Sequence, residues 1–190
     1  MPDSPMQIYL HDKPIKYDGT QLVSHFAYNH FNLLGDAIVS FMGPCDVKID
    51  QLVDLEDVHQ NAFIFSENML HFIVEHFHDD LLLTIAWQRL LIDLIISEMK
   101  VDLPGGPWER RGDDIYDDVF KVSVSIATRS PVSCLIHTGI NISSNNTPVL
   151  TKGLDDYHIN PQALATGVMN RYRAEIESMR KARAKVRGVG

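Results

Sequence analysis

Three polar segments in the second half of the chain hold the side chains best suited to small-molecule chemistry. The first contains paired carboxylates, the second a lysine that alternates with small hydroxyl residues, and the third a histidine and an asparagine around a glycine. An ammonium group binds carboxylates and phosphates, and small neighbouring residues leave room for a ligand beside it. The candidate site residues are Asp113, Asp114, Lys121, Ser123, His137 and Asn141.

Residues 120–128 and 132–143 alternate as two strands that would place these side chains on one wall. In the first strand Lys121 shares a face with the hydroxyl residues, and the other face, directed at the core, carries Val122, Val124 and Ile126. The second strand gathers His137 and its polar neighbours on one face. Because residues 129–131 form a tight turn, the two strands must be antiparallel. We therefore predict that Lys121 and residues 137–141 lie on the same side of a pocket.

These three segments resemble the lipoate- and biotin-protein ligase and octanoyltransferase superfamily. There an Asn-Asp-hydrophobic element precedes a Lys-Ile/Val-Ser/Ala-Gly strand, and a strand with His-Gly or Gly-Ile-Asn follows. Asp113-Asp114-Ile115 is similar to the first element, Lys121-Val122-Ser123 to the second and His137-Thr-Gly-Ile-Asn141 to the third. The clear likeness covers roughly residues 110–155. Length and surrounding elements also resemble an uncharacterised branch grouped with these enzymes, domain of unknown function 366.

The resemblance implies a role for each candidate residue. The strand lysine of the ligases contacts the acyl carbonyl and α-phosphate of an acyl-adenylate, where an ammonium stabilises developing negative charge, and Lys121 would be its counterpart. Asp113 and Asp114 would serve the nucleotide or magnesium end, with Ser123 beside them, and His137 and Asn141 would shape the acceptor side. ATP and Mg²⁺ are then the implied cofactors, and a small anionic or acyl ligand and an acceptor protein the implied partners.

The sequence also departs from the superfamily pattern. The ligases carry an Arg-Arg-x-Ser-Gly-Gly-Gly-type loop around the ligand, whereas residues 43–46 are the only candidate for it here. Val124 stands where the family has a glycine after Lys-x-Ser, and a valine there would close part of the pocket. Thr151-Lys152-Gly153 occupies the region of the octanoyltransferase Pro-Cys-Gly cysteine. These departures disfavour lipoyl-type activity.

Other reactive residues have simpler interpretations. Cys45 follows Pro44 in a predicted loop, but it lacks a nearby activating group, so an inert, partly buried thiol is favoured over a nucleophile. Cys134 alternates with apolar residues and belongs to the core. His76 and His78 could both reach one metal ion from a strand end, although only distant residues could supply a third ligand. We expect no structural metal.

Composition narrows the class of protein. The 190 residues include 17 Lys and Arg and 25 Asp and Glu, a formal charge of −8 that disfavours general nucleic-acid binding. Because there is neither a signal-peptide pattern nor an apolar run long enough to cross a membrane, we expect a reduced, cytoplasmic protein. Seven basic residues follow position 170. They favour the solvated face of a terminal helix, with docking on a homodimer partner or an anionic ligand as the alternative.

The remaining pattern predicts a single α+β domain over residues 1–190, with a mixed, largely antiparallel sheet packed against helices. Residues 7–16 alternate as a hairpin, 20–31 form a helix, 36–42 a strand broken by Gly43-Pro44, and 69–77 a second strand. A long helix begins after Asp79 or Asp80 and runs to about residue 100, residues 114–116 form a short strand, and a basic C-terminal helix covers about 160–187 behind an Asn160 cap.

Two functions agree with these observations. The first is a ligase- or acyltransferase-like enzyme that acts on a small carboxylic acid through an acyl-adenylate. The second is a non-catalytic protein that binds a nucleotide or acyl ligand on the same fold. Lys121 remains equally consistent with an exposed strand-end lysine, and Asp113-Asp114 with a polar turn.

Overall fold

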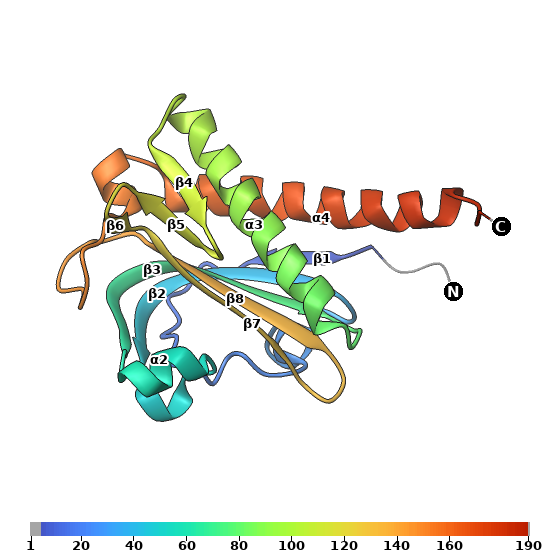
Figure 1. Ribbon diagram of the computed structural model, residues 1–190, viewed down its shortest axis with the longest axis horizontal. Helices are drawn as coiled ribbons and strands as arrows, with labels where there is room; N and C mark the ends of the chain where they lie inside the picture. The colour runs from blue at the N-terminus through green and yellow to red at the C-terminus, as the bar shows by residue number, and fades with distance from the viewer. Residues whose placement is uncertain (1–4, 190) are drawn as a thin grey trace.

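The computed structural model describes residues 5–189 and contains two sheets (Figure 1). The larger sheet has the strand order β1-β2-β3-β8-β7, in which β1 runs parallel to β2 and every other neighbouring pair is antiparallel. Its strands are β1 (Gln7–Leu10), β2 (Ala37–Val47), β3 (Ile64–His76), β7 (Ser123–Arg129) and β8 (Cys134–Asn141). The smaller sheet consists of β4 (Trp108–Arg111), β5 (Asp114–Asp117) and β6 (Phe120–Lys121).

Helices cover the two faces of the large sheet unequally (Figure 1). The longest are α3 (Leu81–Asp102) and α4 (Pro161–Lys185), and the short ones are α1 (Phe26–Phe31), α2 (Leu55–Gln60) and the 3₁₀ turns η1 (Ile49–Gln51) and η2 (Leu154–Tyr157). The fold class predicted from the sequence, a largely antiparallel mixed sheet packed against helices, is confirmed. Among residues 5–189 no helix has the length and apolar character needed to cross a membrane.

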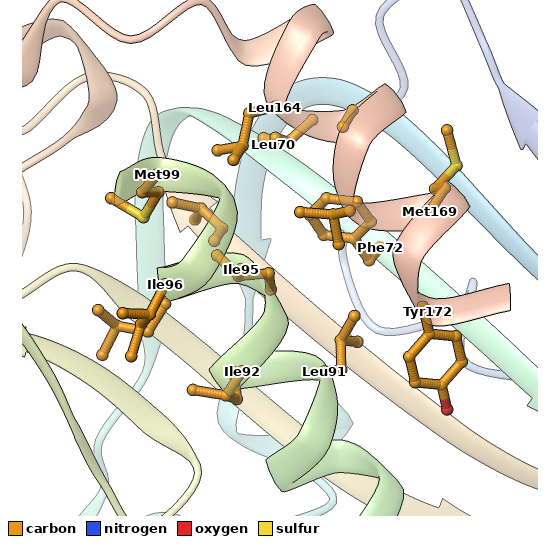
Figure 2. Close-up of a cluster of buried hydrophobic side chains, with 14 of the residues drawn as sticks. Leu70, Phe72, Leu91, Ile92, Ile95, Ile96, Met99, Leu164, Met169 and Tyr172 are labelled. Carbon is orange, nitrogen blue, oxygen red and sulfur yellow. The ribbon is translucent and has the colours of Figure 1, made fainter. Parts of the chain in front are cut away.

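The main core lies between the large sheet and the long helices α3 and α4. Figure 2 shows Leu70 and Phe72 of β3 facing Leu91 and Ile95 of α3 and Tyr172 of α4. All five side chains are fully buried. Alternate residues of β3, including His71 and Ile73, point to the opposite face. A second core lies on that face, where side chains of β2 and β3 pack against α1. It contains Phe26, Val39, Phe41, Cys45, Met69 and Ile73.

The ends of both long helices follow their predicted caps. Asp80 accepts a hydrogen bond from the backbone N–H of Leu83 at 2.9 Å and caps α3. Asn160 accepts from Gln162 and Ala163, each at 3.0 Å, with Pro161 at the first position of α4. Side chains that satisfy the free N–H groups of a first turn stabilise a helix by about 1 kcal/mol. Local sequence therefore determines where these helices start.

Several other predicted elements are wrong. Residues 7–16 do not form a hairpin, because β1 pairs in parallel with β2 instead. Only 26–31 of the predicted helix 20–31 is helical. The strand predicted to break at Gly43-Pro44 continues to Val47 through an irregularity in register between Gly43 and Cys45. Helix α2 and strand β4 were not predicted.

The strand predicted over 120–128 is divided at Val122. Phe120 and Lys121 pair with β5 in the small sheet, whereas Ser123 to Arg129 pair with β8 in the large one. Val122 is fully buried; its N–H donates to Ile115 of β5, and its carbonyl accepts from Asn141 of β8. The chain therefore passes from one sheet to the other at this residue.

Candidate functional site

A cavity of about 580 Å³ lies where the two sheets meet, beside the segment that carries η1 and α2. Its walls come from β5 and β6 of the small sheet, from β7 and β8 of the large sheet, from residues 51–65, which include α2 and the start of β3, and from the loop 148–151. All six candidate residues from the sequence line it: Asp113, Asp114, Lys121, Ser123, His137 and Asn141. The fold thus brings together three segments that are separated along the chain.

Lys121 and Asp114 form an ion pair at the small-sheet side of the cavity. The Lys121 Nζ atom lies 2.7 Å from Oδ2 of Asp114, with 29% and 15% of the two side chains exposed. Tyr116 of β5 pairs with Lys121 of β6 in the ladder, which fixes the lysine beside β5. The lysine is therefore held by a carboxylate at the cavity wall, which corrects the alternative of a free, solvent-exposed strand-end lysine.

Burial acts on both members of this pair. Burial raises the pKa of Asp114, the positive charge of Lys121 opposes that rise, and the result is a pKa of about 6. Burial alone would lower the pKa of Lys121, but the carboxylate of Asp114 raises it above its usual value. Near neutral pH the lysine is charged, and Asp114 titrates within the range in which cells work.

The second aspartate, Asp113, accepts a hydrogen bond from a side chain of helix α3. Gln88 of α3 donates through Nε2 to Oδ2 of Asp113 at 3.0 Å and to Oγ of Ser125 at 2.9 Å. Ser123 Oγ accepts from the N–H of Ile115 at 2.8 Å and lies 3.2 Å from Oδ1 of Asp114. Of the two serines of β7, Ser123 therefore contacts Asp114 directly, whereas Ser125 is linked to Asp113 only through Gln88.

The predicted division of faces along β7 is wrong. Directly paired residues of antiparallel strands point to the same face, and Ile126 pairs with His137 while Val124 pairs with Gly139. These apolar residues therefore share the face of His137, whereas Ser123 and Ser125 point toward the main core. The serines still border the cavity because β7 is an edge strand. Val124 fills space here, since a Cβ on Gly139 would lie 3.4 Å from its Cγ2.

The wall of the cavity on the large sheet is aromatic. His137, only 3% exposed, stacks on Tyr17 with ring centroids 3.7 Å apart and planes within 11°. Its Nε2 lies 3.1 Å from Nδ1 of His71, and Nε2 of His71 lies 3.2 Å from the Gly43 carbonyl oxygen. Burial lowers the pKa of His71 to about 4 and that of His137 well below its usual value. Both rings are therefore neutral at physiological pH.

Several residues of this site were not predicted from the sequence: Tyr17, Asp57, His71 and Gln88. Asp57 of α2 lines the cavity; burial and the neighbouring Asp54 raise its pKa, which the charge of Lys121 partly offsets. For His71 the sequence did contain a signal, because the alternation of residues 69–77 places it on the same face as Ile73. Ile73 pairs with His137 in the structure, and His71 pairs with Gly139.

The other candidates from the sequence lie outside the cavity. Cys45 is fully buried within β2, not in a loop, and burial raises the pKa of its thiol to about 12. Cys134 is also buried. His76 is occupied at both ring nitrogens, by Asp36 and by the Tyr172 hydroxyl, each at 2.9 Å. Within residues 5–189 no group of three or more His, Cys, Asp or Glu side chains could hold a metal ion.

Large apolar side chains surround the cavity near its opening. Those that are substantially exposed are Val53, Phe63, Val119, Val149 and Leu150. Deeper in, Val47, Ile64, Met69 and Val124 continue the apolar lining. The arrangement therefore combines an apolar space with a charged pair at one side, which suits a ligand with an apolar body and an anionic end.

Comparison with known proteins identifies relatives over nearly the whole chain. The family model described as "Domain of unknown function (DUF366)" matches residues 6–187. An uncharacterized protein of Methanocaldococcus jannaschii is 33% identical over 157 residues, or 80% of this chain and 70% of that protein. The solved structure of a protein of unknown function from Pyrococcus horikoshi has a TM-score of 0.91 at 38% identity, covering 97% of this chain and 100% of its own.

Biotin and lipoate protein ligases share the fold at much lower identity. Biotin protein ligase from Aquifex aeolicus, in complex with biotin and ATP, has a TM-score of 0.60 at 14% identity over 92% of this chain and 72% of that one. LipL1 of Plasmodium falciparum, in complex with lipoate, has a TM-score of 0.57 at 13% identity over 91% of this chain and 63% of that one. The predicted superfamily resemblance is confirmed at the level of fold.

Proposed function

Because this chain belongs to the DUF366 family and has the fold of the biotin and lipoate protein ligases, we propose that it binds a small carboxylic acid or its acyl derivative in the 580 Å³ cavity and activates it in a ligase- or acyltransferase-like reaction. The observation that carries this proposal is the Lys121–Asp114 pair at the wall of a cavity that also has an extensive apolar lining. Lys121 is the proposed catalytic residue, with Asp113, Asp114, Ser123, His137 and Asn141 as binding residues.

Lys121 supplies the positive charge that an acyl-transfer reaction requires. A carboxylate that attacks the α-phosphorus of a nucleotide forms an acyl-adenylate and releases pyrophosphate, and negative charge develops on the phosphoryl oxygens. An ammonium that is already fixed beside this point stabilises the charge without reorganisation. Asp114 keeps Lys121 protonated and restricts its position, because its carboxylate lies 2.7 Å from Nζ.

The carboxylates determine how a nucleotide could enter. Asp54, Asp57, Asp113 and Asp114 line the cavity with Lys121, so their formal charges together come to −3 when all are ionised. A bare triphosphate would be repelled, and a divalent cation held by these carboxylates would supply positive charge that reduces the repulsion. Mg²⁺ is commonly held by one or two carboxylates together with substrate phosphates. Asp113 and Asp114 fit that role, and ATP with Mg²⁺ is our proposed cosubstrate.

The second candidate, binding without chemistry, has its own supporting observation. Val124 lies over Gly139 at the position where the ligases have a glycine, so its side chain takes up part of the cavity. The backbone of β7 is thereby kept away from a ligand. An acyl compound could still bind along the apolar wall while the phosphate end is excluded. In that case acid binding would be independent of nucleotide, and no pyrophosphate would be released.

Calorimetry and isotope exchange test the proposal together. The titrants are short- and medium-chain carboxylic acids, each with and without ATP and Mg²⁺, and acid-dependent exchange of labelled pyrophosphate into ATP detects the adenylate. The double variant Lys121→Ala, Asp114→Asn removes the cation without leaving a buried carboxylate unpaired. Since a charge-assisted hydrogen bond contributes about 1.5–3 kcal/mol, affinity for the acid should fall roughly 10- to 150-fold.

Lys16→Ala provides the matched control. Lys16 forms a comparable ion pair with Asp46, at 2.6 Å, but it does not line this cavity. It should bind the acids as the wild type does. Acid binding without exchange would favour the second candidate. No binding of any acid to the folded wild-type protein, with or without nucleotide, would contradict both candidates.

A further inference from the structure

Two buried histidines, His137 in the cavity wall and His71 on the neighbouring strand β3, form a hydrogen-bonded chain with a fixed direction. The chain ends at the Gly43 carbonyl oxygen, which can only accept, so Nε2 of His71 must carry a proton and donate to it at 3.2 Å. Because a neutral imidazole has one donor and one acceptor nitrogen, Nδ1 of His71 is then the acceptor. It accepts from Nε2 of His137, 3.1 Å away. His137 Nδ1 is left unprotonated.

Both rings keep this arrangement because neither is charged near neutral pH. Burial lowers the pKa of each histidine, and the second ring adds to the effect at His137. Tyr17 stacks on both rings, with centroids 5.3 Å from His71 and 3.7 Å from His137, and fixes their planes. A second proton on His71 would occupy Nδ1, which could then no longer accept from His137, so the hydrogen bond between the two rings would be lost.

The unprotonated nitrogen opens onto the cavity. His137 lines it, and within residues 5–189 Nδ1 of His137 makes no hydrogen bond, nor is it sealed away from solvent. Ile126, its paired neighbour on β7, and Val124 and Met69 make this wall largely apolar, and the ring of Tyr17 stacks on His137. A ligand that donates a hydrogen bond to this acceptor gains binding free energy, whereas a purely apolar ligand leaves the acceptor unpaired.

This acceptor lies far from the ion pair along the sheet. Val122 follows Lys121 and bonds to Asn141, whereas Ile126 is paired with His137. Four residues of strand separate these two levels, or about 13 Å at about 3.3 Å per residue. The cavity therefore presents a cationic donor at one end and a neutral acceptor at the other, with apolar side chains between them.

We propose that the natural ligand is a carboxylic acid whose far end carries an N–H or O–H donor, and that Nδ1 of His137 accepts this hydrogen bond. This inference rests on the proposed function, because it assumes that the carboxylate end lies near Lys121. It makes His137 a specificity-determining residue that separates polar-ended acids from simple fatty acids, and it assigns His71 a positioning role, through the proton that it leaves on Nε2 of His137.

Nitrogen NMR of the labelled wild-type protein tests the direction of the chain. One-bond and long-range ¹H–¹⁵N correlations distinguish the two neutral tautomers of histidine. His71 and His137 should both be the Nε2–H form and should not titrate between pH 5 and pH 8. A proton on Nδ1 of His137, or a charged ring in this range, would overturn the proposal.

Matched acids test the specificity. ω-Hydroxy acids of six, eight and ten carbons are compared by calorimetry with the unsubstituted acids and with their ω-methoxy ethers, which accept but do not donate. At least one hydroxy acid should bind about 2- to 12-fold more tightly than its parent, the gain expected from one net hydrogen bond, and its ether should show no gain. Equal binding of all three types would overturn this inference while leaving the proposed function intact.

Two variants assign the effect to the correct atom. His137→Phe keeps a ring for Tyr17 to stack on but removes the acceptor, so the preference for the hydroxy acid should disappear. Tyr17→Phe keeps the stacked ring and both histidines and removes only the hydroxyl, so the preference should remain. Circular dichroism checks that both are folded. If Tyr17→Phe abolishes the preference, or if no acid of any type binds the wild type, the inference fails, and the second result removes the proposed function as well.

Discussion

Replacing Asp114 by Asn should change how the stability of the protein depends on pH. Asp114 is an acid whose pKa is raised by burial from 3.8 to about 6 in the folded state, despite the nearby charge of Lys121. The folded state therefore holds this proton more tightly than the unfolded chain does. Linkage requires that stability falls as the pH rises through this interval, because deprotonation is easier after unfolding. Asp114→Asn removes that loss.

The size of the effect follows from the two pKa values. Each pH unit between them corresponds to about 1.4 kcal/mol, so ionisation of Asp114 lowers the free energy of unfolding by about 3 kcal/mol in total. Roughly 2 kcal/mol of this develops between pH 4 and pH 7, since part is already lost at pH 4. With a urea dependence of about 2 kcal/mol per molar, the midpoint should move by about 1 M.

The assay is urea unfolding of both proteins at intervals from pH 4 to pH 7. The measured quantity is the stability of Asp114→Asn minus that of the wild type, and this difference should rise by roughly 2 kcal/mol across the range. The difference at pH 4, where Asp114 is protonated in the folded wild type, is the baseline from which this rise is measured. Taking the difference also cancels His71 and His137, whose lowered pKa values make both proteins less stable as the pH falls.

An oppositely shifted aspartate supplies the control. Burial alone would raise the pKa of Asp117, but hydrogen bonds from Lys152 and Tyr157, at 2.6 and 2.8 Å, lower it. The difference for Asp117→Asn should therefore fall as the pH rises through the acidic range, because the wild type gains stability there. A difference for Asp114→Asn that stays flat or falls would refute the reasoning, since it would mean that the ion pair outweighs burial.

Three further predictions concern stability and reactivity. Tyr172→Phe should lower the free energy of unfolding by about 1–3 kcal/mol in urea, because the buried Nε2 of His76 loses its hydrogen-bond partner, whereas deletion of the chain from residue 181 onward should change it little, because residues 181–189 are exposed. Gly43→Ala should destabilise by at least about 2 kcal/mol, measured the same way, because its Cβ would lie 2.1 Å from the Ile15 carbonyl oxygen; Gly188→Ala, with open space around it, is the control. Ellman's reagent at pH 8 should label neither Cys45 nor Cys134 until guanidinium unfolds the protein, because both are buried, and reaction of the native protein would contradict this.

The elements that could be predicted from the sequence are those determined by nearby residues. Helix α3 begins after Asp80 and helix α4 after Asn160-Pro161, and the side chains that cap them lie within three residues of the groups they satisfy. The β7–β8 hairpin is likewise local, because its turn follows directly from the flanking alternation. Periodicity and capping are sufficient for such elements.

The errors involve partners that are distant in the sequence. Side chains of residues 7–10 alternate between two faces in the same way in a hairpin with residues 13–16 and in a parallel pair with β2. Only the three-dimensional arrangement selects the parallel pairing. The division at Val122 has the same origin, because Val122 is held by Ile115 on one side and Asn141 on the other. The site could be predicted in part: the family likeness identified Lys121 and His137, but no local pattern places His71 and Tyr17 against His137.

The division of one strand at Val122 has a mechanical consequence. Lys121 belongs to the small sheet and His137 to the large one. The two ends of the cavity therefore lie on different sheets, and the chain passes from one sheet to the other at the single residue Val122. A slight change in the angle between the two sheets would lengthen or shorten the distance between Lys121 and His137 without replacing either side chain. Substitutions packed around the turn could therefore retune the protein for a longer or shorter ligand while its chemistry stayed the same.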